Sequence, residues 1–426
     1  MKRPLASPKE RPASAFFPFL TSHSIYGSVS RIPDVRRLDG DPFSKVRIGE
    51  MARLGKVFLL LLALSVSFAL PAAAIAQATA PLRKVTLLIY SNAPDIGDAP
   101  YWMVPHAMGY FAEEGLEVAP VYAKGASFAI QLLSSNQGDF ALAVPDTLMS
   151  SRQKGVKVKS VFEGNRAYGS ALVIPQSAGI TKREQLKDYL KGGSIGVLSM
   201  TSGRIPYARA WIHELGLTDN DVGLVEVGVG PQAAVAVKTG RVKALVMYDA
   251  AYAAIEAASD IKFTRFETDW QRPFFSGVIV ARDETIQKDP ELVAKFDRAI
   301  AKALAFATTN PDAVVRIYWA LYPENKPTPD NEHAAMQKTV AIVQSMEPNW
   351  THGMDRAGAK WGSQSASDWE KMQEFSSHNG LIPGTLPVNE YFTDEFNDRA
   401  NQFDAASIAR QARAFTPAMI KFGPSK

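Results

Sequence analysis

The chain has 426 residues, of which 46% are apolar and 21% are charged. At roughly 100–200 residues per domain, this length allows two or three domains with real hydrophobic cores and excludes a wholly disordered chain. Cysteine is absent, which excludes disulfides, cysteine zinc sites, cysteine nucleophiles and a lipidated N-terminal cysteine. Residues 1–78 hold 11 Lys/Arg against 5 Asp/Glu, whereas the remainder is near neutral and has no basic stretch suited to nucleic acid.

The segment from Met51 to Ala78 has the pattern of a secretory signal peptide. A short basic start precedes the apolar run from Val57 to Leu70, and small-x-small cleavage patterns end at Ala76 and Ala78. The alternative is a membrane anchor, but Pro71 ends the run well short of the roughly 20 residues that cross a bilayer. We expect cleavage, and export without lipidation to the periplasm of a Gram-negative cell.

Residues 1–50 precede this signal and are rich in Pro, Ser and Arg without a helical or strand period. They are predicted to be disordered or not translated, with Met51 as the biological start. Peptides from residues 1–50 in the exported protein would refute that hypothesis.

Downstream, strands and helices alternate in a first unit. Buried strands are predicted over 85–90, 116–122, 140–144 and 158–163, with helices between them. Ser127 and Asp146 are expected to cap two of these helices. The rhythm predicts an open, mostly parallel sheet with helices on both faces.

A second α/β unit follows. The segment from Ala171 to Pro175 is predicted to leave the first unit, and that from Phe275 to Ala281 to return to it. Between them, strands are expected over 195–198, 224–227 and 244–248, with helices over 206–215 and 232–239. Two lobes joined by two crossings form a cleft whose walls move as rigid bodies. The expected division is residues 79–172 and 277–426 for the first lobe and 173–276 for the second.

The pattern after residue 289 is helical. Leu292, Phe296, Ile300 and Leu304 fit one helical face, and Trp369, Met372 and Phe375 fit another. We expect residues 289–426 to pack as helices around the first lobe; an independent helical domain is the alternative.

Ligands of doubly wound sheets bind at the carboxyl ends of strands, so the loops there are the candidate site. The loop from Ser199 to Arg204 follows a strand and opens a helix, where free amides favour a carboxylate, sulfonate or phosphate. An ordinary Ser/Thr cap explains the same composition. Tyr101 and Trp102 can stack on a flat ligand or simply pack between helix and sheet. Asp146 and Asp249 can accept from a ligand N–H or serve as helix caps.

Catalytic and cofactor motifs are weak. Residues 228–233 match G-x-G-x-x-A, and Asp249 follows at a suitable distance for a dinucleotide site. The short helix and the expected export argue against that interpretation. The sequence has no HExxH motif and no recognisable pairing of nucleophile and base, so we expect no catalytic residue, metal or cofactor.

Four blocks together resemble a known family. They are YWMVPHAMGYFAEEGLEV (101–118), QLLSSNQGD (131–139), ITKREQLKDYLKGGSIGV (180–197) and KTGRVKALVMYD (238–249). They resemble the substrate-binding proteins of ABC importers in the NMT1/THI5-like branch, which serves nitrate, sulfonate, taurine and thiamine-precursor ligands. The resemblance covers residues 82–290 well and the helical tail loosely, and the chain is longer at its C-terminus than is usual for that family.

The resemblance implies a type II periplasmic-binding-protein fold: two doubly wound sheets joined by two crossover strands, here with a helical C-terminal extension. It implies a monomer that delivers a small molecule to an ABC permease in the inner membrane. The implied ligand contacts are Asn92, Tyr101, Trp102, Ser127, Asp146, Ser199, Thr201, Ser202, Gly228 and Asp249.

Two alternatives remain beside this solute-binding role. The first is a periplasmic enzyme on the same scaffold; yeast-type relatives that make the thiamine pyrimidine depend on a cysteine cluster and a sacrificial histidine, and this chain has no cysteine. The second is a solute sensor that docks on a receptor kinase. The sequence does not specify the ligand.

Overall fold

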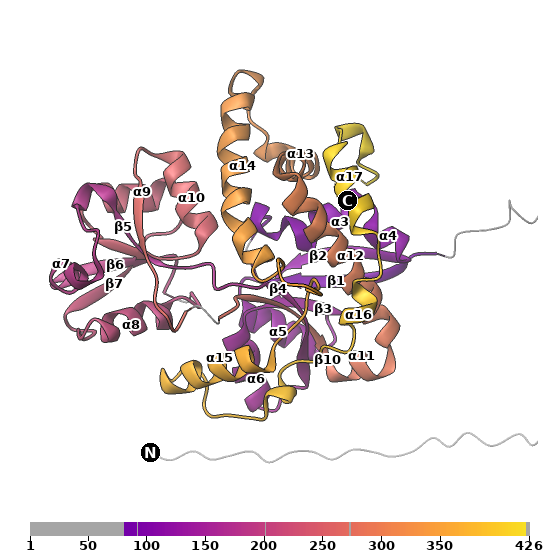
Figure 1. Ribbon diagram of the computed structural model, residues 1–426, viewed down its shortest axis with the longest axis horizontal. Helices are drawn as coiled ribbons and strands as arrows, with labels where there is room; N and C mark the ends of the chain where they lie inside the picture. Colours follow the sequence, from indigo (N-terminus) through magenta and orange to yellow (C-terminus); the bar gives the residue numbers. More distant parts are fainter. Residues whose placement is uncertain (1–80, 92, 201, 272–273, 423–426) are drawn as a thin grey trace, which may run out of the picture. The chain divides into compact units, whose positions relative to one another are not determined.

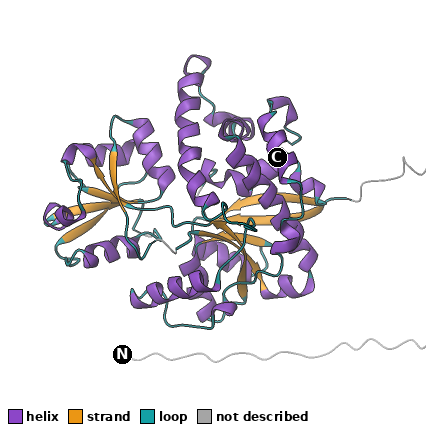
Figure 2. Ribbon diagram, viewed as in Figure 1, coloured by secondary structure: helices purple, strands orange, loops and turns teal. Residues whose placement is uncertain are grey.

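The computed structural model describes residues 81–91, 93–200, 202–271 and 274–422. The predicted signal peptide and the segment before it, as well as Asn92 and Thr201, lie outside the described residues. Residues 79–426 form one compact unit that holds two five-stranded sheets, each covered by helices (Figure 2).

The first sheet has the order β2-β1-β3-β10-β4. Its strands are β1 (Arg83–Ile89), β2 (Leu116–Tyr122), β3 (Phe140–Ala143), β4 (Val158–Asn165) and β10 (Gly277–Arg282). Strands β1, β2 and β3 are parallel, whereas β10 is antiparallel to both β3 and β4. The sheet is therefore mixed, because the chain re-enters it from the second lobe in the opposite direction. Both faces are buried, which explains the continuous apolar runs of its inner strands.

Helices cover both faces of this first sheet (Figure 1). One face packs Leu87 and Ile89 against a large core, and the other packs Leu88 into a second core. The N-terminal helical segments are η1 (Ile96–Tyr101), α3 (Met103–Ala107), α4 (Tyr110–Glu113), α5 (Ala126–Ser134) and α6 (Pro145–Gln153).

The second sheet has the order β7-β6-β8-β5-β9. Its strands are β5 (Leu172–Pro175), β6 (Gly193–Val197), β7 (Val222–Glu226), β8 (Ala244–Val246) and β9 (Phe263–Phe266). Its helical segments are η2 (Gln176–Ala178), η3 (Arg183–Gln185), α7 (Leu186–Leu190), α8 (Ile205–Glu214), α9 (Pro231–Lys238) and α10 (Asp249–Ala258). Strands β6, β7 and β8 are parallel, and β5 is antiparallel to β8 and β9.

The chain passes between the sheets twice, through irregular residues 166–171 and through a second segment described at 267–271 and 274–276. The predicted strands at these points belong to the sheets themselves: β5 is a member of the second sheet and β10 of the first. This is the two-lobed type II fold that the sequence predicted, with the crossings one step outside the strands.

The C-terminal part is helical. It comprises α11 (Asp283–Lys288), α12 (Pro290–Thr309), α13 (Pro311–Leu321), η4 (Pro323–Asn325), α14 (Pro329–Thr351), α15 (Ala366–His378), η5 (Val388–Glu390), α16 (Asn397–Ala400), α17 (Ala405–Arg413) and η6 (Pro417–Met419). Helix α12 begins where the Asp289 carboxylate accepts from the Leu292 N–H, and Pro290 occupies its first turn. Its face of Leu292, Phe296, Ile300 and Leu304 is buried in the core of the first lobe.

Two C-terminal helices also contact the second lobe. Asn349 near the end of α14 donates from Nδ2 to the Asp249 carboxylate at 3.0 Å. On α15, the Phe375 ring stacks on Tyr207 of α8 with centroids 5.3 Å apart. Helices α14 and α15 therefore bind to both lobes, since their other contacts lie in the first (Figure 1).

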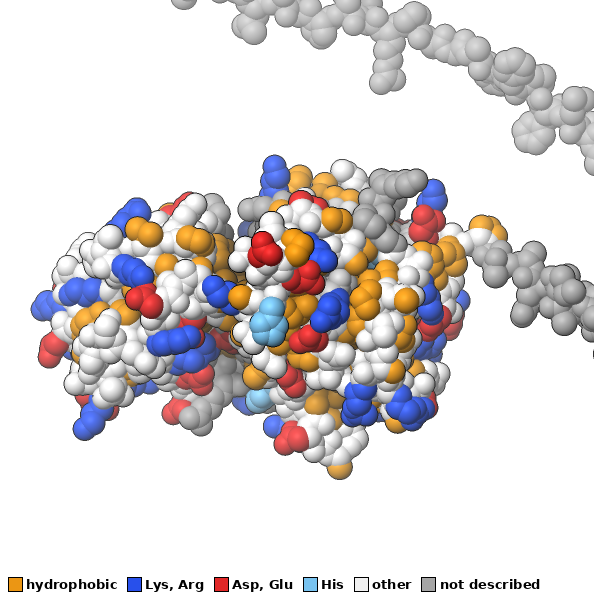
Figure 3. All heavy atoms as spheres, turned by 90° about the horizontal axis from the view of Figure 1, so that it is seen from above, with side chains coloured by type: hydrophobic (Ala, Val, Ile, Leu, Met, Phe, Trp, Pro, Cys, Tyr) orange, Lys and Arg blue, Asp and Glu red, His pale blue; other side chains and the backbone are white. Residues whose placement is uncertain are grey.

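In the described residues, no helix combines the length and the apolar character needed to cross a bilayer. On the face drawn in Figure 3, Lys/Arg and Asp/Glu side chains are interspersed, in keeping with the near-neutral sequence after residue 78.

Candidate functional site

The carboxyl ends of β1, β2 and β3 lie along one edge of the first sheet because these strands are parallel. Tyr90 and Ser91 follow β1, and Asp95 and Asp98 follow in the turn that opens η1. The Ser91 hydroxyl donates to the Asp98 carboxylate at 2.5 Å, and Asp98 is only 4% exposed. Burial and the nearby Asp95 carboxylate raise the pKa of Asp98 to about 8. The hydrogen bond from Ser91 opposes this rise.

Tyr101 and Trp102 are buried in the core of the first lobe. The Tyr101 hydroxyl donates to Asn165 Oδ1 at 2.9 Å, at the carboxyl end of β4. The Trp102 indole N–H donates to the Tyr322 hydroxyl at 2.9 Å, and that hydroxyl is 3.0 Å from the hydroxyl of Tyr122. Both rings therefore pack between helix and sheet in the core of the first lobe.

The structure corrects two predicted caps. Helix α5 has Gly125 at its N-cap without a side-chain cap, and Ser127 is an exposed residue of its first turn. Helix α6 has Val144 at its N-cap, and Asp146 lies in the first turn, where it accepts from the Thr147 N–H at 2.9 Å. Pro145 shifts the helix start toward the N-terminus because its fixed φ suits the first helical position. The Asp146 carboxylate is thus held at the end of β3.

In the second lobe, Arg204 is the central residue of the candidate site. The helix it precedes, α8, has no side-chain cap, and the Ser202 hydroxyl accepts from the Arg204 N–H at 3.2 Å. The guanidinium carbon lies 4.4 Å from the ring centroid of Tyr168 and 5.9 Å from that of Tyr207. Among the described residues, no carboxylate forms an ion pair with Arg204.

Arg204 lies close enough to the first lobe to affect its acids. Burial raises the pKa of Asp146, and the Thr147 N–H and the Arg204 charge oppose that rise. Ser199 lies on the same loop as Arg204 and also has an interaction partner. A cation stacked on two rings without a carboxylate partner is suited to a bound anion or a flat π-system.

Two predicted residues of the second lobe have structural contacts. Asp249 begins α10, and its carboxylate pairs with Arg265 and accepts from Asn349, so its oxygens are already used. Gly228 has φ +66° and precedes α9. Tyr248 lies next to Asp249, just after the end of β8. Burial raises the pKa of its hydroxyl above the usual range, and the charges of Asp95 and Asp98 raise it further.

The strand ends of the two lobes therefore present one group of side chains, here called the strand-end cluster: Tyr90, Asp98, Asp146, Arg204 and Tyr248. Burial raises the pKa of Tyr90, with contributions from groups of both lobes, Asp98 first and then Asp95 and Tyr248. The sequence analysis placed Asp146 here and named the Arg204 loop, but it did not select Tyr90, Asp98, Arg204 or Tyr248. Tyr90 and Tyr248 lie at the ends of predicted strands, whereas Asp98 and Arg204 lie further along the loops that follow such strands.

The cluster combines aromatic rings, a cation and buried carboxyl groups, which are suited to a flat ligand with both donors and acceptors. The described residues contain no group of three His, Asp or Glu side chains that could hold a metal ion.

Two α/β lobes linked by two crossings, with polar and aromatic groups at facing strand ends, define a protein of the type II periplasmic-binding fold. Comparison with known proteins agrees. The ligand-binding component of an ABC-type import system from Staphylococcus aureus superposes with a TM-score of 0.53 at 14% identity, covering 75% of this chain and all of that one. The chain belongs to the NMT1/THI5-like family, whose model matches residues 101–314.

Relatives in this family carry different names. A riboflavin-binding protein of Chloroflexus aurantiacus is 26% identical over 343 residues, covering 76% of this chain and 91% of that protein. A 4-amino-5-hydroxymethyl-2-methylpyrimidine phosphate synthase of Saccharomyces cerevisiae is 24% identical over 312 residues, covering 68% and 81% respectively. The proteins similar to this chain thus include one named for binding and one named for synthesis.

Proposed function

We propose that this chain is the exported solute-binding component of an ABC importer, and that its two lobes close on a flat, nitrogen-containing aromatic ligand. The observation that carries the proposal is the strand-end cluster. In it, the charges of Asp98 from one lobe and Arg204 from the other affect the pKa of both Tyr90 and Tyr248. A riboflavin-binding relative supports a ring ligand.

Domain closure is the expected binding mode. A ligand between the lobes favours the closed state because that state gives it contacts from both walls, whereas the open state gives contacts from one. The crossings at 166–171 and 267–276 would act as the hinge, between lobes of residues 79–172 with 277–426 and 173–276. Of the predicted contacts, Asp146 belongs to the cluster, and Ser199 and Ser202 remain proposed ligand contacts beside it.

Export forms the second part of the proposal. The segment 51–78 would direct the chain to the periplasm, where it would work as an unlipidated monomer that docks on an inner-membrane permease. Mass spectrometry of the periplasmic protein should find an N-terminus after Ala76 or Ala78 and no peptides from residues 1–50.

The test of binding uses riboflavin and 4-amino-5-hydroxymethyl-2-methylpyrimidine as probes, together with native mass spectrometry of protein taken directly from cells. A ligand at 100 times its Kd stabilises the folded state by about 2.7 kcal/mol, which thermal unfolding detects. Arg204→Met should weaken binding about tenfold to hundredfold through loss of a stacked or hydrogen-bonded cation. Arg209→Met is the matched control, because Arg209 lies exposed on α8, the helix that Arg204 precedes. Equal binding by both variants would contradict the site.

The second candidate is an enzyme, favoured by the relatives named as pyrimidine phosphate synthases. The absence of cysteine speaks against a mechanism that needs a thiol. Incubation of the purified protein with each bound probe, followed by mass spectrometry of the small molecules, separates the two candidates. Release of the probe unchanged favours binding, whereas a converted product favours the enzyme.

A further inference from the structure

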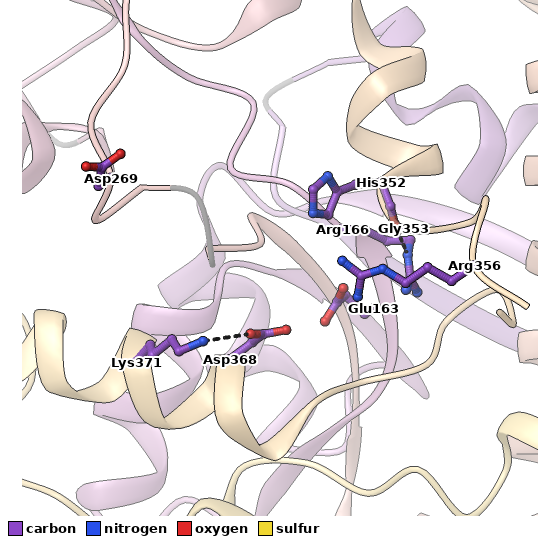
Figure 4. Close-up of a pocket in the computed structure, with 8 residues that line it drawn as sticks. All are labelled: Glu163, Arg166, Asp269, His352, Gly353, Arg356, Asp368 and Lys371. Carbon is purple, nitrogen blue, oxygen red and sulfur yellow. Dashed lines mark hydrogen bonds and ion pairs between the residues drawn. The ribbon is translucent and has the colours of Figure 1, made fainter.

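A cavity lies beside the crossings, next to the carboxyl end of β4. Its volume is about 680 Å³, and it is lined by Glu163, Arg166, Asp269, His352, Gly353, Arg356, Asp368 and Lys371 (Figure 4). These residues come from the end of β4, both crossing segments, the loop after α14, and α15. We call this space the hinge cavity. It shares no residue with the strand-end cluster, and its volume falls in the range typical of small-molecule sites.

Glu163 is the unusual residue of the hinge cavity. It is only 6% exposed, and in Figure 4 its carboxyl points into the space between Arg356 and Asp368. Its backbone N–H donates to the Gly362 carbonyl at 3.0 Å, which fixes the residue in place. Among the described residues, however, none gives its carboxyl a hydrogen bond or an ion pair. The Glu163 carboxyl therefore faces the cavity instead of a partner within the described residues.

Cations also line the hinge cavity: Arg166 and Arg356 are drawn beside Glu163, and Lys371 beside Asp368 (Figure 4). Arg166 is anchored, since its guanidinium donates to the carbonyls of His352 at 2.8 Å and Ser363 at 3.1 Å. Arg356 is different, because in the described part of the chain its guanidinium has no hydrogen bond or ion pair. Lys371 pairs only loosely with Asp368, at 3.8 Å.

These groups define the chemistry of an occupant. A simple anion would fit Arg356 but would face the carboxyls of Glu163 and Asp368. A metal ion is disfavoured because the described residues contain no cluster able to hold one. A molecule that carries both charges satisfies both sides, with a cationic N–H group on Glu163 and an anionic group on Arg356.

We propose that the hinge cavity is a second ligand site and that it takes a small zwitterion of the amino acid class. Its ammonium group donates to Glu163, and its carboxylate accepts from Arg356, with Lys371 and His352 nearby. The site is independent of the ligand held at the strand ends.

The test measures binding to the purified protein by isothermal titration calorimetry. The probes are glycine, L-alanine and L-serine, with acetate and methylammonium as matched halves of the zwitterion. We expect at least one amino acid to bind and both halves to bind at least tenfold more weakly. Acetate binding as tightly as glycine, or no binding by any of the three amino acids at millimolar concentration, would overturn the assignment.

Variants locate the site. Glu163→Gln and Arg356→Gln should each weaken amino acid binding about tenfold to hundredfold, the usual effect of losing one charge-assisted hydrogen bond. Glu374→Gln, exposed on α15, and Arg209→Gln, exposed on α8, are the charge-matched controls. Binding that survives both cavity variants unchanged would place the amino acid elsewhere. Binding that is lost in Arg204→Met but kept in the cavity variants would assign it to the strand-end cluster instead.

Discussion

Gly362 joins the C-terminal segment to the edge of the first sheet and allows no side chain. Its φ is +81°, and a Cβ built there would lie 2.2 Å from the ring carbons Cδ2 and Cε2 of Phe162. Phe162 is 1% exposed in the core of the first lobe, so its ring has no free space into which to move. Gly362→Ala should therefore strain the backbone and overpack the core at once.

The size of the effect follows from these two terms. The left-handed backbone costs about 1–2 kcal/mol for alanine, and overpacking a core costs about 1–3 kcal/mol. Gly362→Ala should lower the free energy of unfolding by roughly 2–5 kcal/mol. Gly358→Ala is the matched control, because Gly358 has φ +77° in the same segment but no atom within 4 Å of its Cβ position. Gly358→Ala should lose only the roughly 1–2 kcal/mol that the left-handed backbone costs.

Urea unfolding followed by tryptophan fluorescence measures both variants, and the m-values check that the transitions are comparable. The reasoning predicts that Gly362→Ala is less stable than Gly358→Ala by about 1–3 kcal/mol. If the two variants unfold at the same urea concentration, the close packing of Gly362 on Phe162 is wrong.

Two further predictions concern buried polar groups. Burial raises the pKa of Glu163 to about 8 from a usual 4.5, with the Arg166 charge opposing and Asp368 and Asp394 adding to the rise. Glu163 ionises at a lower pH in the unfolded chain than in the folded protein, so stability should fall as the pH rises from 4.5 to 8, by on the order of 3–5 kcal/mol. Urea midpoints at pH 5 and pH 8 measure this loss, which should be much smaller in Glu163→Gln. An equal loss in both proteins would refute this. Tyr322→Phe leaves the buried Trp102 N–H without an acceptor and should cost about 1–3 kcal/mol in urea unfolding; Tyr318→Phe, a neighbouring tyrosine on α13, is the control, and similar losses in the two variants would contradict the role of that hydrogen bond.

The C-terminal extension deserves a functional explanation because α14 and α15 bind both lobes. Asp249 and Asn349 join α10 to α14, and Tyr207 and Phe375 join α8 to α15. If the lobes move relative to each other, these contacts must break or move with the second lobe.

The sequence by itself determined the order of strands and helices and therefore the fold. Strands buried on both faces require continuous apolar runs, and helices on a core require an apolar face, so both leave a local signal, as in β1 and α12. It also predicted which loops hold the candidate site, because the carboxyl ends of parallel strands meet at one edge.

Only the tertiary structure decided which side chains of those loops are available. Trp102 is buried against Tyr322, and Asp249 is paired with Arg265 and Asn349. Arg204, by contrast, has no carboxylate partner within the part of the chain that the structure describes. The hinge cavity, with Glu163 facing a C-terminal loop, was equally invisible. Such partnerships join residues up to about two hundred positions apart, and no local periodicity records which of them meet, since that depends on how whole elements pack.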